Sequence, residues 1–95
     1  MGAFYKIKDG FELRRYEGKT FAVPALNSGL YFNGTIELNP LGEFMFIRLQ
    51  NGTTIDKLAD EIMVNFTGAE RRIVVSDIQR FVDQLEGAGL IDFIN

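Results

Sequence analysis

The chain has 95 residues, 46% of them hydrophobic and 24% charged, and its 13 acidic and 10 basic side chains give a net charge of −3. This length fits a single domain over residues 1–95, with little spare core around which to build a deep pocket. Since the chain contains no His and no Cys, it lacks the usual neutral-pH base, thiolate nucleophile and zinc ligands. We therefore expect no enzyme activity, no metal and no cofactor.

No run approaches the roughly 18 apolar residues of a membrane-spanning helix, and the N-terminal residues show no apolar signal segment. The acidic balance also disfavours nonspecific attraction to nucleic acid. We expect a soluble cytoplasmic protein that binds neither membrane nor nucleic acid.

The first part of the chain has the patterns of β-strands. Residues 11–16 alternate apolar and polar side chains, and residues 20–23 are β-prone and stop at Pro24. A loop of Tyr16, Glu17 and Gly18 pairs Leu13 with Phe21 and gathers the apolar side chains on one face, whereas a two-residue loop would scatter them over both faces. We expect the three-residue loop.

A third strand is predicted at residues 35–38, which alternate again before Asn39 and Pro40 end the pattern. Residues 25–34 contain two turn-forming Asn-Ser-Gly and Asn-Gly segments, so we expect a loop or a small added hairpin there. Alternate amides of an edge strand point in opposite directions, so either the Ile36 or the Glu37 amide faces outward, and proline substitutions at the two positions would tell which.

Three helices follow. The first spans residues 40–50 and ends at Gly52, and the second spans residues 54–65 with Thr54 as N-cap. The third begins at a Ser76 cap, after a β-branched lead-in at residues 73–75, and ends at Gly87. The predicted fold is α+β, with a three-stranded antiparallel sheet within 10–39 followed by a winged-helix-like three-helix bundle within 40–87. Residues 90–94 form an apolar tail that packs back on the core.

The sequence shows no cluster of side chains suited to catalysis. Asp56, Asp60 and Glu61 lie on the polar face of the second helix, which is typical of a solvated surface. What remains is a sheet edge beside the third helix, where another chain can add as a strand. Asp77, Arg80 and Gln84 follow one flank of that helix and can either rim a peptide site or simply face solvent. We place Phe81 on the buried stripe of the same helix.

The order of four segments, residues 36–42, 49–58, 77–85 and 89–91, resembles the PqqD family. The shared pattern is a strand into Leu-Asn-x-x-Gly, a helix closed by Gly, a Thr-led helix, and a helix reading Asp-Ile-x-x-Phe-Val-x-x-Leu before Gly-Leu. Two departures are Pro40 and Leu41, where polar and Thr residues are usual, and a longer insertion at 25–33.

The resemblance implies a non-catalytic recognition element of ribosomally made, modified peptides. Such a domain holds the leader segment of a precursor peptide as an added strand between its third strand and third helix. It presents the peptide to a modifying enzyme, often a radical S-adenosylmethionine enzyme. The matching positions in this sequence are Thr35, Ile36, Glu37, Leu38, Asp77, Arg80, Phe81 and Gln84.

Two other classes remain open. An oligomerising module can use the same sheet edge for self-pairing, although we expect a monomer or weak dimer. A winged-helix DNA binder shares the three-helix outline, but Asp77, Asp83 and Glu86 oppose Arg80 alone on the predicted third helix, which is the wrong sign for a major groove.

Overall fold

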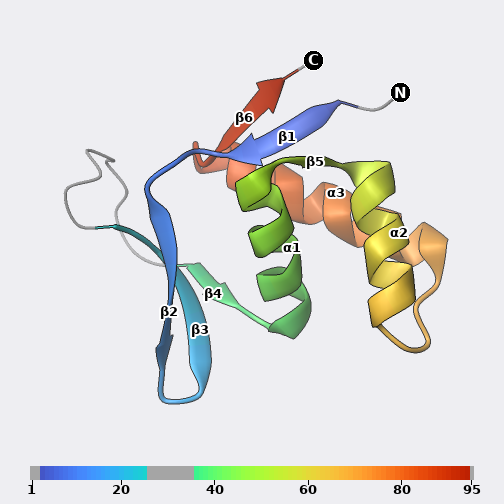
Figure 1. Ribbon diagram of the computed structural model, residues 1–95, viewed down its shortest axis with the longest axis horizontal. Helices are drawn as coiled ribbons and strands as arrows, with labels where there is room; N and C mark the ends of the chain where they lie inside the picture. Colours follow the sequence, from blue (N-terminus) through green and yellow to red (C-terminus); the bar gives the residue numbers. More distant parts are fainter. Residues whose placement is uncertain (1–2, 26–35, 95) are drawn as a thin grey trace.

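The computed structural model describes residues 3–25 and 36–94. The fold is α+β: the antiparallel sheet β2-β3-β4 lies beside three helices, and a second sheet, β5-β1-β6, crosses the C-terminal end of α1 (Figure 1). The elements in chain order are β1 (Phe4–Ile7), β2 (Phe11–Tyr16), β3 (Lys19–Pro24), β4 (Ile36–Leu38), α1 (Pro40–Asn51), β5 (Thr53–Thr54), α2 (Ile55–Asn65), α3 (Arg71–Gly87) and β6 (Ile91–Ile94).

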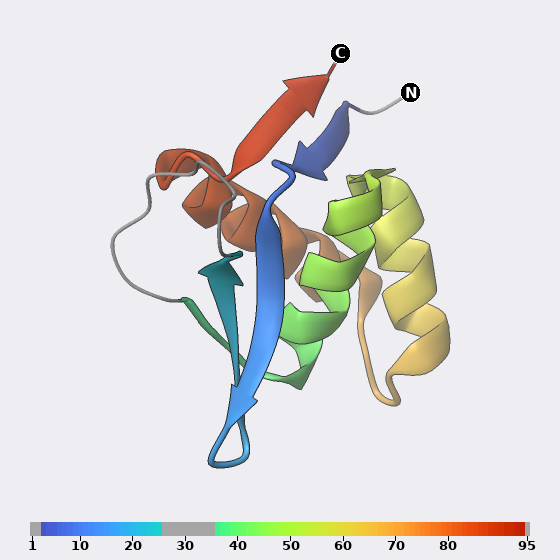
Figure 2. The same cartoon turned by 60° about the vertical axis from the view of Figure 1, so that its left-hand side comes forward.

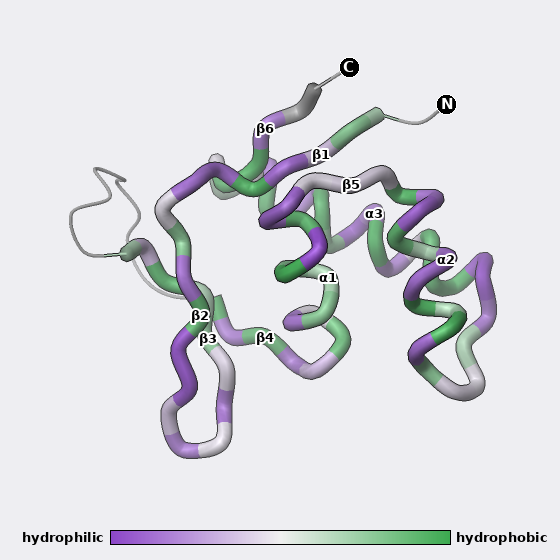
Figure 3. Tube along the Cα trace, viewed as in Figure 1, coloured by the Kyte–Doolittle hydropathy of each residue, from purple (hydrophilic) through white to green (hydrophobic). Residues whose placement is uncertain are grey.

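The β2–β3 hairpin has a two-residue loop, so the predicted three-residue loop is wrong. Tyr16 pairs with Lys19 and Leu13 pairs with Ala22. Glu17 and Gly18 both have positive φ, at 51° and 77°, as a turn whose twist matches that of the strands requires. This register turns the small Ala22, which is fully buried, toward the core and leaves half-buried apolar side chains on the outer face. The hairpin projects beyond the helices (Figure 2), and its tip is hydrophilic (Figure 3).

The register also decides which amides of β4 face outward. Ala25 N–H donates to the carbonyl of Gly10 (2.6 Å), so the odd-numbered residues of β3 bond to β2 and the even-numbered ones bond to β4. The even-numbered partners of β4 are Ala22, opposite Ile36, and Thr20, opposite Leu38. The main-chain groups of Ile36 and Leu38 therefore point inward, and those of Glu37 point away from the sheet. Of the two orientations that the sequence left open, the register therefore gives the one with the Glu37 amide outward.

The second sheet lies outside the predicted strand range of 10–39. β1 pairs antiparallel with the two-residue β5 and with β6 near the other end of the chain, from Phe4 opposite Ile94 to Ile7 opposite Ile91. Its Ile7 is buried in the core. The apolar tail expected at residues 90–94 thus packs back as a paired strand.

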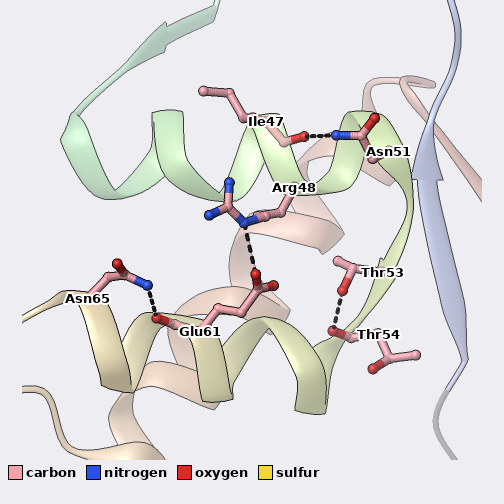
Figure 4. A network of polar contacts seen from close by, with 7 residues as sticks. All are labelled: Ile47, Arg48, Asn51, Thr53, Thr54, Glu61 and Asn65. Carbon is pink, nitrogen blue, oxygen red and sulfur yellow. Dashed lines mark hydrogen bonds and ion pairs between the residues drawn. The ribbon is translucent and has the colours of Figure 1, made fainter.

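Helices α1 and α2 begin and end close to the predicted residues. Asn39 accepts a hydrogen bond from the Gly42 amide (2.7 Å), and Thr54 accepts one from the Lys57 amide (3.1 Å), as N-caps do. Gly52, with φ of 90°, ends α1. An ion pair from Arg48 to Glu61 (3.0 Å) joins the two helices (Figure 4).

Helix α3 begins at Arg71, five residues before the predicted Ser76 cap. The β-branched residues read as a lead-in lie inside the helix, because Val74 is buried there and continues the apolar stripe one turn toward the N-terminus. Burial outweighs the small cost of β-branching in a helix. The stripe that faces the core is Val74, Ile78, Val82 and Leu85.

Candidate functional site

A groove of about 380 Å³ runs between β4, the first turns of α1 and one flank of α3. We call it the β4–α3 groove. Its lining residues are Ile36, Glu37, Leu38, Asn39, Leu41, Gly42, Met45, Asp77, Arg80, Phe81 and Gln84.

The floor of the groove is apolar and its rim is polar. Leu38 and Met45 are buried, with 6% and 4% of their surface exposed, and Phe81 is half-buried against the core beside them. Arg80 and Gln84 are exposed along the α3 side. A segment lying in the groove can therefore bury an apolar side chain while its polar groups stay at the rim.

The turn from β4 into α1 forms the Leu38 end of the groove. Asn39 continues the extended backbone, with φ of −77° and ψ of 173°, while its side chain caps α1 through the Gly42 amide. The packing is close: a Cβ atom on Gly42 would lie 3.1 Å from Asn39 Oδ1 and 3.5 Å from Leu38 Cδ2. The Leu-Asn-x-x-Gly pattern thus builds this end of the groove.

The open edge of β4 borders the groove. No strand pairs with the outer side of β4 within residues 3–25 and 36–94, and Glu37 directs its main-chain N–H and C=O to that side. An extended segment placed there can extend the β2-β3-β4 sheet by one strand.

Charged side chains around the groove form ion pairs. Arg80 lies 3.3 Å from Asp77 on the same face of α3, and Lys19 reaches Glu37 across the sheet at 4.0 Å. Both pairs are largely exposed to solvent, where ion pairs contribute little to stability. Their charges are available to a bound chain.

Outside the groove, a hydrogen bond from Lys6 (2.8 Å) holds the pKa of the Asp9 carboxyl below its usual range.

The structure gathers seven of the eight predicted site residues in this one groove, and Thr35 lies outside the described residues. Strand and helix residues from opposite halves of the sequence thereby line one surface. Sequence reasoning from the residues missed the contribution of α1, namely Leu41, Gly42 and Met45. The signal was the Asn-x-x-Gly spacing, because a capped first turn brings the helix start against the strand that precedes it.

The expectation that Phe81 lies on the buried stripe needs correction. Its neighbour Val82 is 1% exposed and belongs to the core, whereas Phe81 is half-buried and forms a wall of the groove. The two side chains leave α3 about 100° apart, so only one of them can face the core fully.

The charge argument against DNA binding also changes with the earlier helix start. Arg71 and Arg72 now belong to α3 and balance its three acidic residues. Arg71, however, pairs with Asp60 and Asp56 of α2, at 2.5 and 3.7 Å, and Arg72 pairs with Glu70 at 3.5 Å. The helix presents a balanced surface, not the basic one that a phosphate backbone requires.

Neither a metal cluster nor a membrane segment is found in the described parts of the chain. Within residues 3–25 and 36–94, no group of three or more acidic side chains converges to hold a metal ion. No described helix is both long and apolar enough to cross a membrane.

Comparisons with known proteins place the chain in a family. The sequence model described as "Coenzyme PQQ synthesis protein D (PqqD)" matches residues 23–91, which is most of the chain and all of the groove. The chain belongs to the PqqD family. A search of curated proteins finds no match.

A solved structure has the same fold. It is described as TbiB1 in complex with the TbiA(beta) leader peptide, and it superimposes with a TM-score of 0.69 at 17% sequence identity, over 92% of this chain and 94% of that one.

Proposed function

We propose that this PqqD-family protein is a non-catalytic peptide-binding protein. It holds the leader segment of a precursor peptide as an added strand in the β4–α3 groove and presents the rest of the peptide to a modifying enzyme, in this family often a radical S-adenosylmethionine enzyme. The protein works as a monomer or weak dimer in the cytoplasm.

One observation carries the proposal. The outward main-chain groups of Glu37 lie beside a groove with a buried apolar floor, at Leu38 and Met45, and an exposed polar rim on α3. Main-chain pairing along such an edge gives affinity, and the floor and rim select side chains. Family membership and the fold shared with a leader-bound protein support the same occupant.

Direct binding tests the proposal. The probes are synthetic peptides that match the N-terminal segments of short open reading frames flanking the gene, each with a scrambled control. The expected result is a 1:1 complex by calorimetry, with amide shifts concentrated at Glu37, Arg80 and Gln84 and none with the scrambled peptide. Shifts confined to β1 and β6 would overturn the placement, and a doubled mass without peptide would favour self-pairing.

Presentation needs a separate experiment. The flanking modifying enzyme is supplied with the full precursor, with and without this protein. Turnover should rise when the protein is added, and this rise should vanish in a variant that no longer binds the leader. An unchanged turnover would contradict the presenting role while leaving peptide binding intact.

A further inference from the structure

A second hollow of about 250 Å³ lies where the end of α2 meets the start of α3. We call it the α2–α3 hollow. Its floor is made by Ile62 and Val74, which are 1% and 6% exposed, and its walls by the half-buried Phe66 and Ala69. Ile73 stands at the rim with 51% of its surface exposed. Ile73 and the hollow beside it together form a patch of apolar surface that is open to solvent.

This hollow adjoins the β4–α3 groove. Both are lined by Leu41, in the first turn of α1, and by Asp77 of α3. Leu41 follows the Leu38 end of β4 by three residues. A chain that pairs along β4 and continues past Leu38 therefore passes Leu41 and arrives at the hollow.

We propose that the α2–α3 hollow is a second subsite for the same peptide, and that it takes one large apolar side chain from the segment N-terminal to the β4-paired strand. The inference rests on the proposed function. The direction follows from the sheet, in which all pairs are antiparallel. A guest strand antiparallel to β4 has its N-terminal side at the Leu38 end.

The charges around the hollow restrict the peptide further. Its two charged lining residues, Glu70 and Asp77, are both acidic, and both already pair with arginines of α3. An acidic residue next to the apolar side chain would face two carboxylates without a free cation among the lining residues. The subsite thus selects an apolar residue with neutral or basic neighbours.

Selection from a random library tests this subsite without knowledge of the natural peptide. A phage library of random 20-residue peptides is panned against the wild-type protein, Ile73→Glu and Val64→Glu. Val64 is the matched control, because it is 84% exposed on α2 and lines neither the β4–α3 groove nor the α2–α3 hollow. Wild type and Val64→Glu should enrich Leu, Ile, Phe or Met N-terminal to the β4-paired segment, and Ile73→Glu should lose that enrichment.

A double-mutant cycle then couples the peptide residue to the hollow. Replacing the enriched apolar residue by Ala should weaken binding to wild type about tenfold or more and leave binding to Ile73→Glu unchanged. Additive effects would overturn the subsite, as would enrichment on the C-terminal side alone. A wild-type dimer that Ile73→Glu dissociates would also overturn it, in favour of a second copy. Failure of the proposed function looks different, since Glu37→Pro would then leave the selected peptides bound.

Discussion

Each of the two three-stranded sheets has two edge strands, and β4 of the β2-β3-β4 sheet and β6 of the β5-β1-β6 sheet border different surfaces (Figure 1). β4 lies beside the groove whose other wall is α3. β6 pairs with β1 close to the two chain ends, and its described side chains line neither the β4–α3 groove nor the α2–α3 hollow.

This difference shows which features turn an edge strand into a candidate peptide-binding site. Any edge strand offers unpaired amides, so main-chain pairing alone cannot select a guest. At β4, a buried floor of Leu38 and Met45 and the charges of α3 add side-chain selection. We therefore expect β4 to be the binding edge and the second sheet to support the helices.

The largest effect is expected from proline substitutions in β4. Because the Glu37 amide points outward, Glu37→Pro should weaken peptide binding about 100-fold or abolish it, with a thermal midpoint near that of wild type. The neighbouring Ile36→Pro removes an inward ladder donor and should lower the midpoint by about 5 °C or more. Calorimetric titration and thermal melts of both variants measure this, and a reversed pattern would contradict the assigned register.

The next effect separates the wall of the groove from the core of α3. Leu85 is 2% exposed, so Leu85→Ala should cost about 2–5 kcal/mol of unfolding free energy and leave the affinity of the folded protein unchanged. Phe81→Ala should cost less, about 2 kcal/mol, because Phe81 is half-buried, and should weaken the peptide about tenfold. Urea unfolding and calorimetry supply the two numbers. Equal loss of affinity in both variants would mean that the groove does not use Phe81.

A third prediction tests whether the second sheet is only structural. Gly52 has φ of 90°, and a Cβ atom there would lie 2.3 Å from the ring of Phe4 in β1. Gly52→Ala should cost at least about 1 kcal/mol of stability and leave peptide affinity unchanged. Adding Phe4→Ala should relieve the clash and restore part of the loss, leaving the backbone strain. If peptide affinity fell together with stability, the second sheet would also contribute to peptide binding.

The sequence predicted the parts of the fold that depend on neighbouring residues. Alternation predicted β2 and β4, β-prone residues predicted β3, and the predicted Thr54 cap sits where α2 begins. The second sheet was missed because its register joins Phe4 to Ile94 and to Thr54, and no local pattern in a two-residue strand specifies such partners. The prediction of a three-residue hairpin loop was wrong because it relied on gathering the apolar side chains on one face. The two-residue turn at Glu17 and Gly18 fits the twist of the strands better.

The candidate site was predictable in outline through the resemblance to the PqqD family. Strand and helix positions such as Glu37 and Arg80 line one groove, as the shared pattern implied. The α2–α3 hollow was not predictable, because it depends on where α3 starts. With a start at Ser76, Ile73 and Val74 would lie outside the helix and no hollow would form. One turn of helix therefore decides whether the groove has an extension.

The smallest expected effect comes from the charge on the α3 side of the groove. Arg80→Glu removes an exposed ion pair with Asp77 and places two carboxylates three residues apart, so the loss of stability should be about 0.5 kcal/mol, the scale of surface ion pairs. Arg14→Glu is the matched control, because Arg14 also pairs with a nearby carboxylate, that of Glu12, but lines neither the β4–α3 groove nor the α2–α3 hollow.

If the peptide places an acidic residue opposite α3, Arg80→Glu should weaken binding severalfold at low salt, and the difference from wild type should shrink as the ionic strength rises. Arg14→Glu should bind as wild type does at every salt concentration. Titrations at about 20 and 300 mM salt separate the two, since the screening length shortens several-fold over that range. Equal weakening in both variants would mean that overall charge, and not the rim of the groove, attracts the peptide. A gain in affinity for Arg80→Glu alone would keep the rim as the contact but reverse the charge assigned to the guest, making basic residues the ones that lie against α3.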